Sequence, residues 1–237
     1  MVDGLLAAGC TVLVPAFADD FLVAPPPGRR PGRNGWDYDF APDSGPAGSG
    51  LIYTPATGRI DRDMGAVAAE VVGRPGRARG EHPLNSFAAV GPLAGPLTAR
   101  QRPLAVFGPL RGLAEADGFV VLMGVGPERL TLIHLAEALA GRQPFRRWAN
   151  GPDGRPMMCA TGGCSEGFGR LEPTLALHGR DWQVGASRWR AFPARATLEA
   201  LAAAIRQRPE VTRCVDRDCA RCRDAIAGGP ILPGEGG

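Results

Sequence analysis

The stretch FVVLMGVGPERLTLIHLAEALAGR, residues 119–142, joins a strand pattern to a helix pattern through a Gly-Val-Gly turn. Its first part, FVVLMGVG at 119–126, is apolar and rich in valine, which predicts a buried strand. After a turn at PERL, the spacing of the leucines predicts a helix at about 130–140. Ligands of open α/β sheets bind where such a strand ends. The stretch therefore predicts an α/β fold with a candidate site at this turn.

The predicted helix carries one polar pair, His134 and Glu137, three positions apart and on the same side. The stripe opposite the pair, which we expect to be buried, consists of Leu132, Leu135, Ala136 and Leu139. A solvated polar face with an incidental histidine is one explanation. A general base is the other, because a carboxylate beside an imidazole fixes its tautomer and the pair follows a strand end. The glycines match neither the Rossmann spacing nor a P-loop, so they predict no nucleotide cofactor.

Helix and strand patterns alternate along much of the chain. TVLVPAF at 11–17 predicts a second buried strand. DRDMGAVAAEVVGRPG at 61–76 predicts a helix that Asp61 or Asp63 caps and Gly73 ends. Between them, the Pro, Gly and Asp of residues 24–50 predict an extended loop. Further expected elements are the end of a helix at 1–8, a strand in 85–94, a short helix in 109–118, a strand region at 182–192 and a helix at 196–208.

Composition limits the class of protein. A chain of 237 residues with 44% hydrophobic content can bury the core of one sizeable domain. The 27 basic residues are arginines scattered among 24 acids, which argues against nucleic-acid binding. No apolar run reaches the roughly 18 to 20 residues of a membrane span. The N-terminal segment lacks a basic region and carries Asp3, so we expect no secretion signal and a cytoplasmic protein.

Three of the six cysteines lie close together near the C-terminus. Cys214, Cys219 and Cys222 have the spacing C-x4-C-x2-C, which predicts a zinc ligand set in a reducing compartment. A tetrahedral site needs a fourth ligand, for which Cys164 is our first choice and Cys159 the second. Four thiolates leave no open position on the metal, so its role would be structural. The alternative is a set of reduced thiols without metal.

Three stretches, taken together, resemble the aminoglycoside 3-N-acetyltransferase family of antibiotic N-acetyltransferases. LMGVGPERLTLIHLAE (122–137) is similar to the family's Gly-Val-Gly strand end followed by a Leu-His-x-x-Glu helix. GEHPLNSFAAVGPLA (80–94) resembles its His-Pro-x-x-Ser segment, and DRDMGAVAAEVV (61–72) its Met-Gly helix. The resemblance covers most of residues 1–210 and implies one α/β domain of the family's own type, not the GNAT fold, with a central mixed sheet flanked by helices. Residues 211–237 would form a cysteine-rich tail packed on it.

The resemblance implies transfer of an acetyl group from acetyl-coenzyme A to an amine. His134 matches the family's general base, and Glu137 matches the acid beside it. GGCSEGFGRLEP at 162–173 resembles a family segment that would place Glu166 near the acceptor as a third catalytic residue. An ammonium group is no nucleophile until it loses a proton, so a base is chemically required.

The same resemblance assigns His82 and Ser86 to the cofactor site, and we place Thr131 there as well. Ser86 could donate a hydrogen bond to the developing oxyanion or the departing thiolate. Taken alone, His-Pro-x-x-Ser is better explained as a turn.

Acidic residues are our candidates for binding an aminoglycoside, because these substrates are polycations. We assign Asp37, Asp39 and Asp63 to this role, with Asp43 as a further loop candidate. The expected partners are acetyl-coenzyme A and a small-molecule amine, with neither nucleic acid nor membrane, and a monomer or homodimer. Modification of the antibiotic would confer resistance.

Relative to the family, we expect the chain to lack a first helix and a first strand with a Ser-Ser-Leu-like segment that helps hold coenzyme A. Either the true start lies upstream of Met1, or part of the cofactor site is missing and the chain is a degenerate relative that binds a ligand or partner without catalysis. A separate alternative is a hydrolase or transferase that uses His134 on another acyl donor. The absence of a G-x-S-x-G elbow argues against the usual α/β hydrolase.

Overall fold

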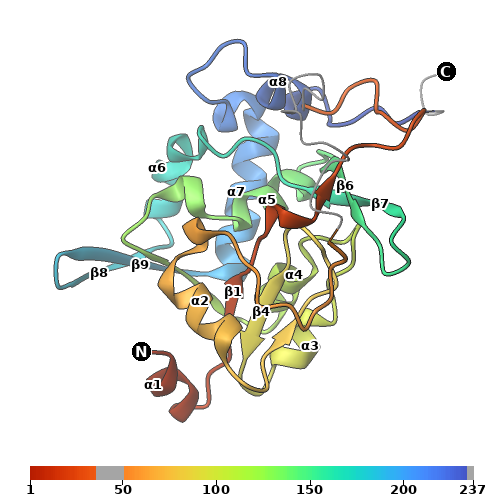
Figure 1. Ribbon diagram of the computed structural model, residues 1–237. Helices are drawn as coiled ribbons and strands as arrows, with labels where there is room; N and C mark the ends of the chain where they lie inside the picture. The colour runs from red at the N-terminus through yellow and green to blue at the C-terminus, as the bar shows by residue number, and fades with distance from the viewer. Residues whose placement is uncertain (36–50, 234–237) are drawn as a thin grey trace. The chain divides into compact units, whose positions relative to one another are not determined.

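A computed structural model describes residues 1–35 and 51–233 (Figure 1). These residues divide into two compact units. The first unit holds residues 1–30, 51–109 and 146–161. The second holds residues 31–35, 110–145 and 162–233. Residues 211–233, which were predicted to form a C-terminal tail, thus belong to the same unit as residues 110–145. The domain boundary at residue 210 stays a prediction.

The first unit is built on an antiparallel sheet of the order β1-β4-β3. These strands are β1 (Val12–Pro15), β4 (Phe87–Val90) and β3 (Ala78–Arg79). Helices α1 (Val2–Ala7) and α2 (Gly65–Gly73) pack on them, and α3 (Ala94–Thr98) follows β4. Their shared core consists of Val2, Val14, Ala16, Ala68, Val71, Val72, Ala88 and Val90. The strands predicted in 11–17 and 85–94 and the helix predicted in 61–76 are therefore confirmed.

The predicted cap of α2 is wrong, because neither Asp61 nor Asp63 caps that helix. A 3₁₀ turn, η2 (Arg62–Met64), precedes α2 and separates Asp61 from its first turn. The carboxylate of Asp61 instead accepts the backbone N–H of Asp19 at 3.2 and 3.3 Å, at the start of η1 (Asp19–Phe21). Partial burial raises the pKa of Asp61, and the acids around it act in the same direction.

A second sheet, β2-β6-β7, has no counterpart in the sequence-based expectations. It consists of β2 (Leu22–Val23), β6 (Phe145–Asn150) and β7 (Pro156–Thr161). The core beside it is formed by Ala18, Phe21, Tyr53, Leu84, Ala149 and Cys159. The segment between β6 and β7, GPDGR, carries the turn residues that could have indicated a hairpin.

The second unit contains the sheet β5-β9-β8, in which the strands pair antiparallel. Its strands are β5 (Phe119–Met123), β9 (Ser187–Pro193) and β8 (Arg180–Val184). The strand predicted at 119–126 is confirmed, but its burial is wrong: Phe119 is 59% exposed and Val121 is 41% exposed. Alternate residues of a strand face opposite sides, and on the face opposite Phe119 and Val121 only Leu122 is buried.

The single strand region predicted at 182–192 is a hairpin of β8 and β9. Val184 pairs with Ser187, which leaves a two-residue turn at Gly185 and Ala186. Gly185 has a φ of +58°, the conformation that glycine adopts at the first position of a type II′ turn.

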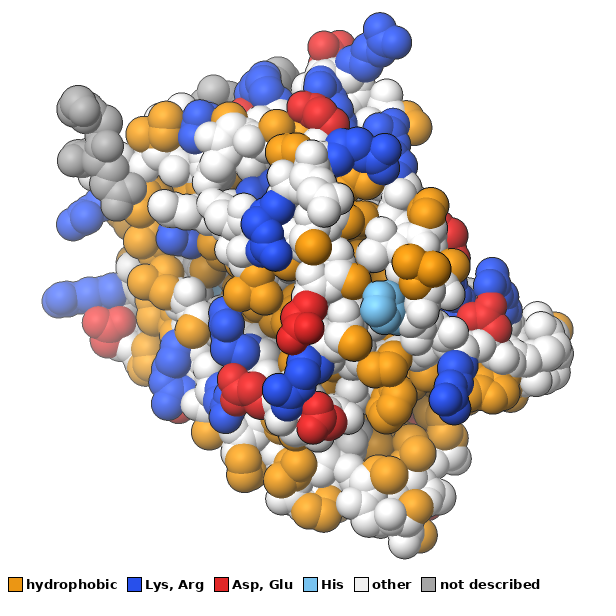
Figure 2. All heavy atoms as spheres, turned by 180° about the vertical axis from the view of Figure 1, so that it is seen from behind, with side chains coloured by type: hydrophobic (Ala, Val, Ile, Leu, Met, Phe, Trp, Pro, Cys, Tyr) orange, Lys and Arg blue, Asp and Glu red, His pale blue; other side chains and the backbone are white. Residues whose placement is uncertain are grey.

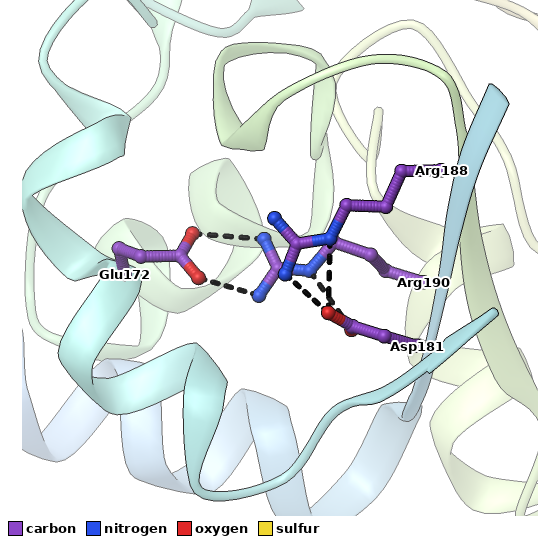
Figure 3. Close-up of polar contacts among 4 residues, drawn as sticks. All are labelled: Glu172, Asp181, Arg188 and Arg190. Atoms are coloured by element: carbon purple, nitrogen blue, oxygen red, sulfur yellow. Dashed lines mark hydrogen bonds and ion pairs between the residues drawn. The ribbon is translucent and has the colours of Figure 1, made fainter. Parts of the chain in front are cut away.

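A buried arginine ties this hairpin to α6 (Glu172–Ala176). The guanidinium of Arg190 donates to both carboxylate oxygens of Glu172, at 2.8 and 2.6 Å (Figure 3). Asp181 on β8 accepts from Arg190 at 3.3 Å and from the Nε of Arg188 at 2.9 Å. The hydrogen bond from Arg188 lowers the pKa of Asp181. The network aligns the two strands and the helix and accounts for the burial of Arg190.

The second unit also contains the helices α5 (Leu132–Leu139), α7 (Ala194–Gln207) and α8 (Ala220–Ile226). Helix α4 (Gly108–Glu115) begins with two residues of the first unit and continues in the second. The 3₁₀ turns of the second unit are η3 (Pro127–Arg129), η4 (Phe168–Leu171) and η5 (Pro209–Thr212). The helices predicted in 109–118, 130–140 and 196–208 are confirmed. Helix α5 packs against α7. Leu139, predicted to be buried, is 38% exposed because the helix ends there, whereas Ile133 is fully buried.

The α/β class is confirmed, with a correction to its sheets. The strands of the described residues form three sheets of three strands each, where one central mixed sheet was expected. These strands are two to seven residues long, and turns or short helices separate them.

None of the described helices combines the length and apolar composition needed to cross a membrane. Figure 2 shows several arginines close to acidic side chains on one face of the molecule.

Candidate active site

His134 and Glu137 form a hydrogen-bonded pair within α5. The Nδ1 atom of His134 lies 2.8 Å from Oε2 of Glu137, as the i, i+3 spacing allows. Their side chains are only 12% and 10% exposed, respectively. The pair is therefore not part of a solvated helix face, which was the simpler explanation of its spacing.

The second oxygen of Glu137 determines the tautomer of the histidine. Oε1 accepts a hydrogen bond from Nη1 of Arg142 at 2.6 Å, in a buried ion pair. A carboxylate paired with a guanidinium can only accept, so Nδ1 of His134 must donate its hydrogen to Oε2. The lone pair of the imidazole is then on Nε2, which is the form that a general base requires.

Arg142 was not among the residues singled out from the sequence. The helix ends before Gly141, whose φ of +101° turns the chain back so that Arg142 N–H donates to the Glu137 carbonyl at 3.0 Å. The guanidinium also donates to Oγ1 of Thr212 at 2.7 Å and to the Pro209 carbonyl at 2.5 Å. An arginine just after a helix stop could have indicated the ion pair with Glu137. Nothing in the sequence indicates η5.

The imidazole of His134 is enclosed by two further residues that sequence reasoning missed. The ring of Phe168 meets it edge to face, with centroids 4.8 Å apart. On another side lies Gly162, where a Cβ would stand 2.6 Å from Cδ2 and 2.8 Å from Nε2 of the imidazole. Glycine is therefore required at this position if the ring is to keep its place.

Thr131 and Glu166 lie in the same unit as His134. Thr131 is the N-cap residue of α5, and its carbonyl accepts the backbone N–H of His134 at 3.0 Å. The side chain of Glu166 is exposed, while its backbone N–H donates to the sulfur of Cys164. Their assigned roles, at the cofactor and at the acceptor, stay predictions.

His82 and Ser86 lie in the first unit, fully buried. Nε2 of His82 donates to the carbonyl of Ala160 at 2.7 Å, because a carbonyl can only accept. Nδ1 accepts the backbone N–H groups of Leu84 at 3.2 Å and Asn85 at 2.9 Å, which closes the turn after His82. Both nitrogens of the neutral imidazole are therefore hydrogen-bonded within the fold.

Ser86 is also engaged within the fold. Its hydroxyl donates to the Ala16 carbonyl at 2.8 Å and accepts from Nε of the buried Arg79 at 2.9 Å. The His-Pro-x-x-Ser segment thus has the turn-forming contacts that we expected of it in isolation, and a role of either residue at the thioester stays a prediction.

Burial lowers the pKa of His82 from 6.5 to about 4, although its hydrogen bond to Ala160 opposes the shift. Between pH 6.5 and pH 4 the imidazole is protonated in the unfolded chain but neutral in the folded chain. The free energy of unfolding therefore decreases as the pH falls through this range. The full difference corresponds to roughly 3 kcal/mol. We expect urea unfolding of His82→Gln to show a weaker pH dependence in this range than the unsubstituted protein.

The control for this experiment is His178→Gln, since His178 is half-buried after α6. An equal pH dependence for the unsubstituted protein and His82→Gln would show that the buried imidazole does not control acid stability.

The predicted substrate residues are only partly described. Asp37 and Asp39, with Asp43, lie outside the described residues. Asp63 lies exposed in η2 of the first unit, two residues from Asp61. Its role in binding a polycation stays a prediction.

The structure brings four cysteines together in the second unit. The Sγ atoms of Cys164, Cys214, Cys219 and Cys222 all lie within 4.8 Å of one another. Cys159 lies elsewhere, in the core of the first unit. Burial raises the pKa of Cys164 to about 11 and also raises that of Cys222. Partial burial acts to raise the pKa of Cys219, but hydrogen bonds within the cluster outweigh it and lower the pKa.

Comparison with known proteins gives one consistent family. A family sequence profile described as "Aminoglycoside 3-N-acetyltransferase" matches residues 7–206. Aminoglycoside N(3)-acetyltransferase VIII of Streptomyces fradiae is 42% identical over 91 residues, which are 37% of this chain and 32% of the relative. Aminoglycoside N(3)-acetyltransferase IV of Salmonella sp is 38% identical over 101 residues, 40% of this chain and 38% of the relative. The matched segment thus spans about a third of the length of these curated relatives.

Solved structures show the same fold. The crystal structure of the aminoglycoside acetyltransferase AAC(3)-IVa apoenzyme is similar with a TM-score of 0.71 and 23% identity, over 96% of this chain and 82% of that one. A structure of AAC-IIIb in a binary complex with CoASH is similar with a TM-score of 0.64 and 24% identity, over 84% of this chain and 78% of that one. At these identities the likeness supports the fold alone.

Proposed function

Because the chain belongs to the aminoglycoside 3-N-acetyltransferase family, we propose that it transfers the acetyl group of acetyl-coenzyme A to an amino group of an aminoglycoside-like substrate. The observation that carries the proposal is the histidine held by Glu137 and Arg142, with its basic nitrogen at Nε2. The names of the curated relatives and the CoASH complex of AAC-IIIb support the choice of substrate and acetyl donor.

In the proposed reaction, the substrate amine gives up a proton to Nε2 of His134 as it attacks the thioester carbonyl. The new C–N bond forms, the C–S bond breaks, and the imidazolium of His134 returns the proton to the departing sulfur, so coenzyme A leaves as a thiol and the base is regenerated. Glu137 stabilises the imidazolium that forms, and Arg142 keeps the carboxylate in place. We further propose Glu166 for the acceptor site, His82, Ser86 and Thr131 for the cofactor site, and Asp37, Asp39 and Asp63 for the polycation. Acetylation of an antibiotic in this way would confer resistance.

A thiol-release assay tests the proposal. We expect free coenzyme A thiol to appear only when acetyl-coenzyme A and an aminoglycoside are both present. Release at the same rate without an amine would indicate thioester hydrolysis, and no release with any member of an aminoglycoside panel would favour a binding protein without catalysis. Either outcome would contradict the proposed transfer.

We also propose that the four clustered cysteines bind one structural Zn²⁺ ion, in a reducing compartment such as the cytoplasm. Zinc held by four thiolates at about 2.3 Å places the sulfurs about 3.8 Å apart. The observed limit of 4.8 Å fits this arrangement after small side-chain adjustments. Cys214 lies in the loop after η5, Cys219 is the N-cap residue of α8, and Cys222 lies within α8. Cys164 comes from the loop after β7, so a metal would cross-link distant parts of one unit.

Elemental analysis of protein purified without chelator checks the metal. We expect about one equivalent of zinc per chain, and much less than that in Cys222→Ser. Cys10→Ser is the matched control, because Cys10 is exposed and outside the cluster. Less than about a tenth of an equivalent in the unsubstituted protein would exclude a structural zinc site.

A further inference from the structure

The cysteine cluster and the histidine site are joined by two short backbone segments of the second unit. In the first, Gly162-Gly163-Cys164, the residue that packs against the imidazole of His134 stands two positions before a cysteine of the cluster. The backbone N–H of Glu166 donates to the sulfur of that same cysteine. A shift of Cys164 would therefore move the wall of the imidazole site.

The second segment runs from η5 into the cluster. Pro209 and Thr212 both accept hydrogen bonds from Arg142, the residue that holds Glu137. Cys214 follows Thr212 by two positions, and its backbone N–H donates to the sulfur of Cys222 at 3.4 Å. A shift of Cys214 would therefore move the acceptors that fix Arg142.

The two segments also touch each other. A Cβ on Gly167 would stand 2.2 Å from the Thr212 carbonyl oxygen and 2.4 Å from the carbonyl of Arg213, so the backbones are in direct contact there. Phe168, the next residue, is the one that packs edge to face on His134. The imidazole thus contacts the segment that leads to Cys164, and Arg142, which holds Glu137, contacts the segment that leads to Cys214.

We propose that metal binding by the four cysteines sets the position of His134, so that Cys164 and Cys214 act as positioning residues for the base. The expected change in kcat rests on the proposed acetyl transfer. The expected change in the position of His134 does not. Zn²⁺ binding displaces the thiol protons and converts four sulfurs that would repel one another as thiolates into one rigid centre. Without the ion, both segments lose their fixed end, and Gly162 and Thr212 no longer define the site.

Metal removal provides the main test. The whole protein is stripped of zinc with a chelator under reducing conditions, and Zn²⁺ alone is then added back. Long-range ¹H–¹⁵N spectra of the imidazoles, with His134 assigned by comparison with His134→Ala, report its tautomer and hydrogen bonding. We expect the His134 signals to change on removal and to return with Zn²⁺. We also expect kcat to fall roughly 100-fold, with KM changed much less, because the base is misplaced and not removed.

If the zinc-free protein unfolds, two threonine variants of the zinc-loaded protein test the connection between the cysteine cluster and Arg142. Thr212→Val removes the hydroxyl that accepts from Arg142, and we expect a three- to tenfold loss of kcat, in the range of about one hydrogen bond. Thr197→Val is the matched control: Thr197 is fully buried in α7, and its hydroxyl has no hydrogen-bond partner among the described residues. We expect this control to leave kcat and the His134 signals unchanged.

The outcomes separate this inference from the proposed function. Unchanged His134 spectra and kcat in protein holding less than about a tenth of an equivalent of zinc would overturn the positioning role. Metal-dependent His134 spectra in a protein that acetylates no aminoglycoside would support the positioning role and contradict the proposed activity. An effect of Thr197→Val equal to that of Thr212→Val would show a general loss of packing and would also overturn the inference.

Discussion

Replacing His134 with alanine is expected to lower kcat for acetyl transfer by roughly 10²- to 10⁴-fold, the contribution typical of a positioned general base. The reason is the geometry of α5, in which Glu137 accepts from Nδ1 at 2.8 Å and leaves the lone pair on Nε2. An ammonium substrate that no base deprotonates cannot attack the thioester. Steady-state kinetics of thiol release, with acetyl-coenzyme A and an aminoglycoside both varied, measure the effect.

Two controls make this experiment decisive. His178→Ala removes a half-buried histidine of the loop after α6 and should retain full activity. Circular dichroism and thermal unfolding of His134→Ala should show a folded protein, because the ring is lost from the edge of the core and not from its centre. Undiminished turnover in a folded His134→Ala protein would refute the assigned base.

The second large effect is expected from Arg142→Met, which should lower the free energy of unfolding by about 3 to 5 kcal/mol. Arg142 and Glu137 are 8% and 10% exposed, so the substitution leaves a buried carboxylate without its cationic partner. It also removes the hydrogen bonds to Thr212 and Pro209 that hold η5. Urea unfolding followed by circular dichroism measures the loss, and kcat should fall with it because Glu137 is no longer fixed.

The surface pair of Arg195 and Asp117 supplies the control, because both side chains are more than half exposed. Arg195→Met should change stability far less than Arg142→Met. The double variant Glu137→Leu with Arg142→Met should be more stable than Arg142→Met alone, since it removes the unpaired charge as well. A double variant that is no more stable than Arg142→Met would contradict this account of the ion pair.

Local sequence patterns predicted most of the helices and several strands. They did not predict strands that form only by pairing with residues far away in the sequence. Helix α5 follows from leucine spacing, and β1 and β4 follow from short apolar runs with clear ends. The strands β2 and β3 have two residues each and exist only because a partner strand is present, so no local signal marks them. The exposure of β5 depends on what covers its outer face, which a valine-rich run does not reveal.

The candidate site was predictable where the chemistry lies within one helix turn. The spacing of His134 and Glu137 requires that they meet, whereas Arg142 needs the turn at Gly141, and Thr212 comes from a 3₁₀ turn 70 residues farther along the chain. The cysteine cluster was predictable because three members are close in sequence and thiolate sites are four-coordinate. Gly162 could not be recognised, because only the packed imidazole beside it explains why a side chain is excluded there.

The most direct test of the proposed transfer is the identity of the product. We expect mass spectrometry and NMR of a reaction with purified protein, acetyl-coenzyme A and an aminoglycoside to show one acetyl group on a substrate nitrogen, in amounts equal to the coenzyme A thiol released. Thiol release accompanied by free acetate and unmodified aminoglycoside would contradict the account.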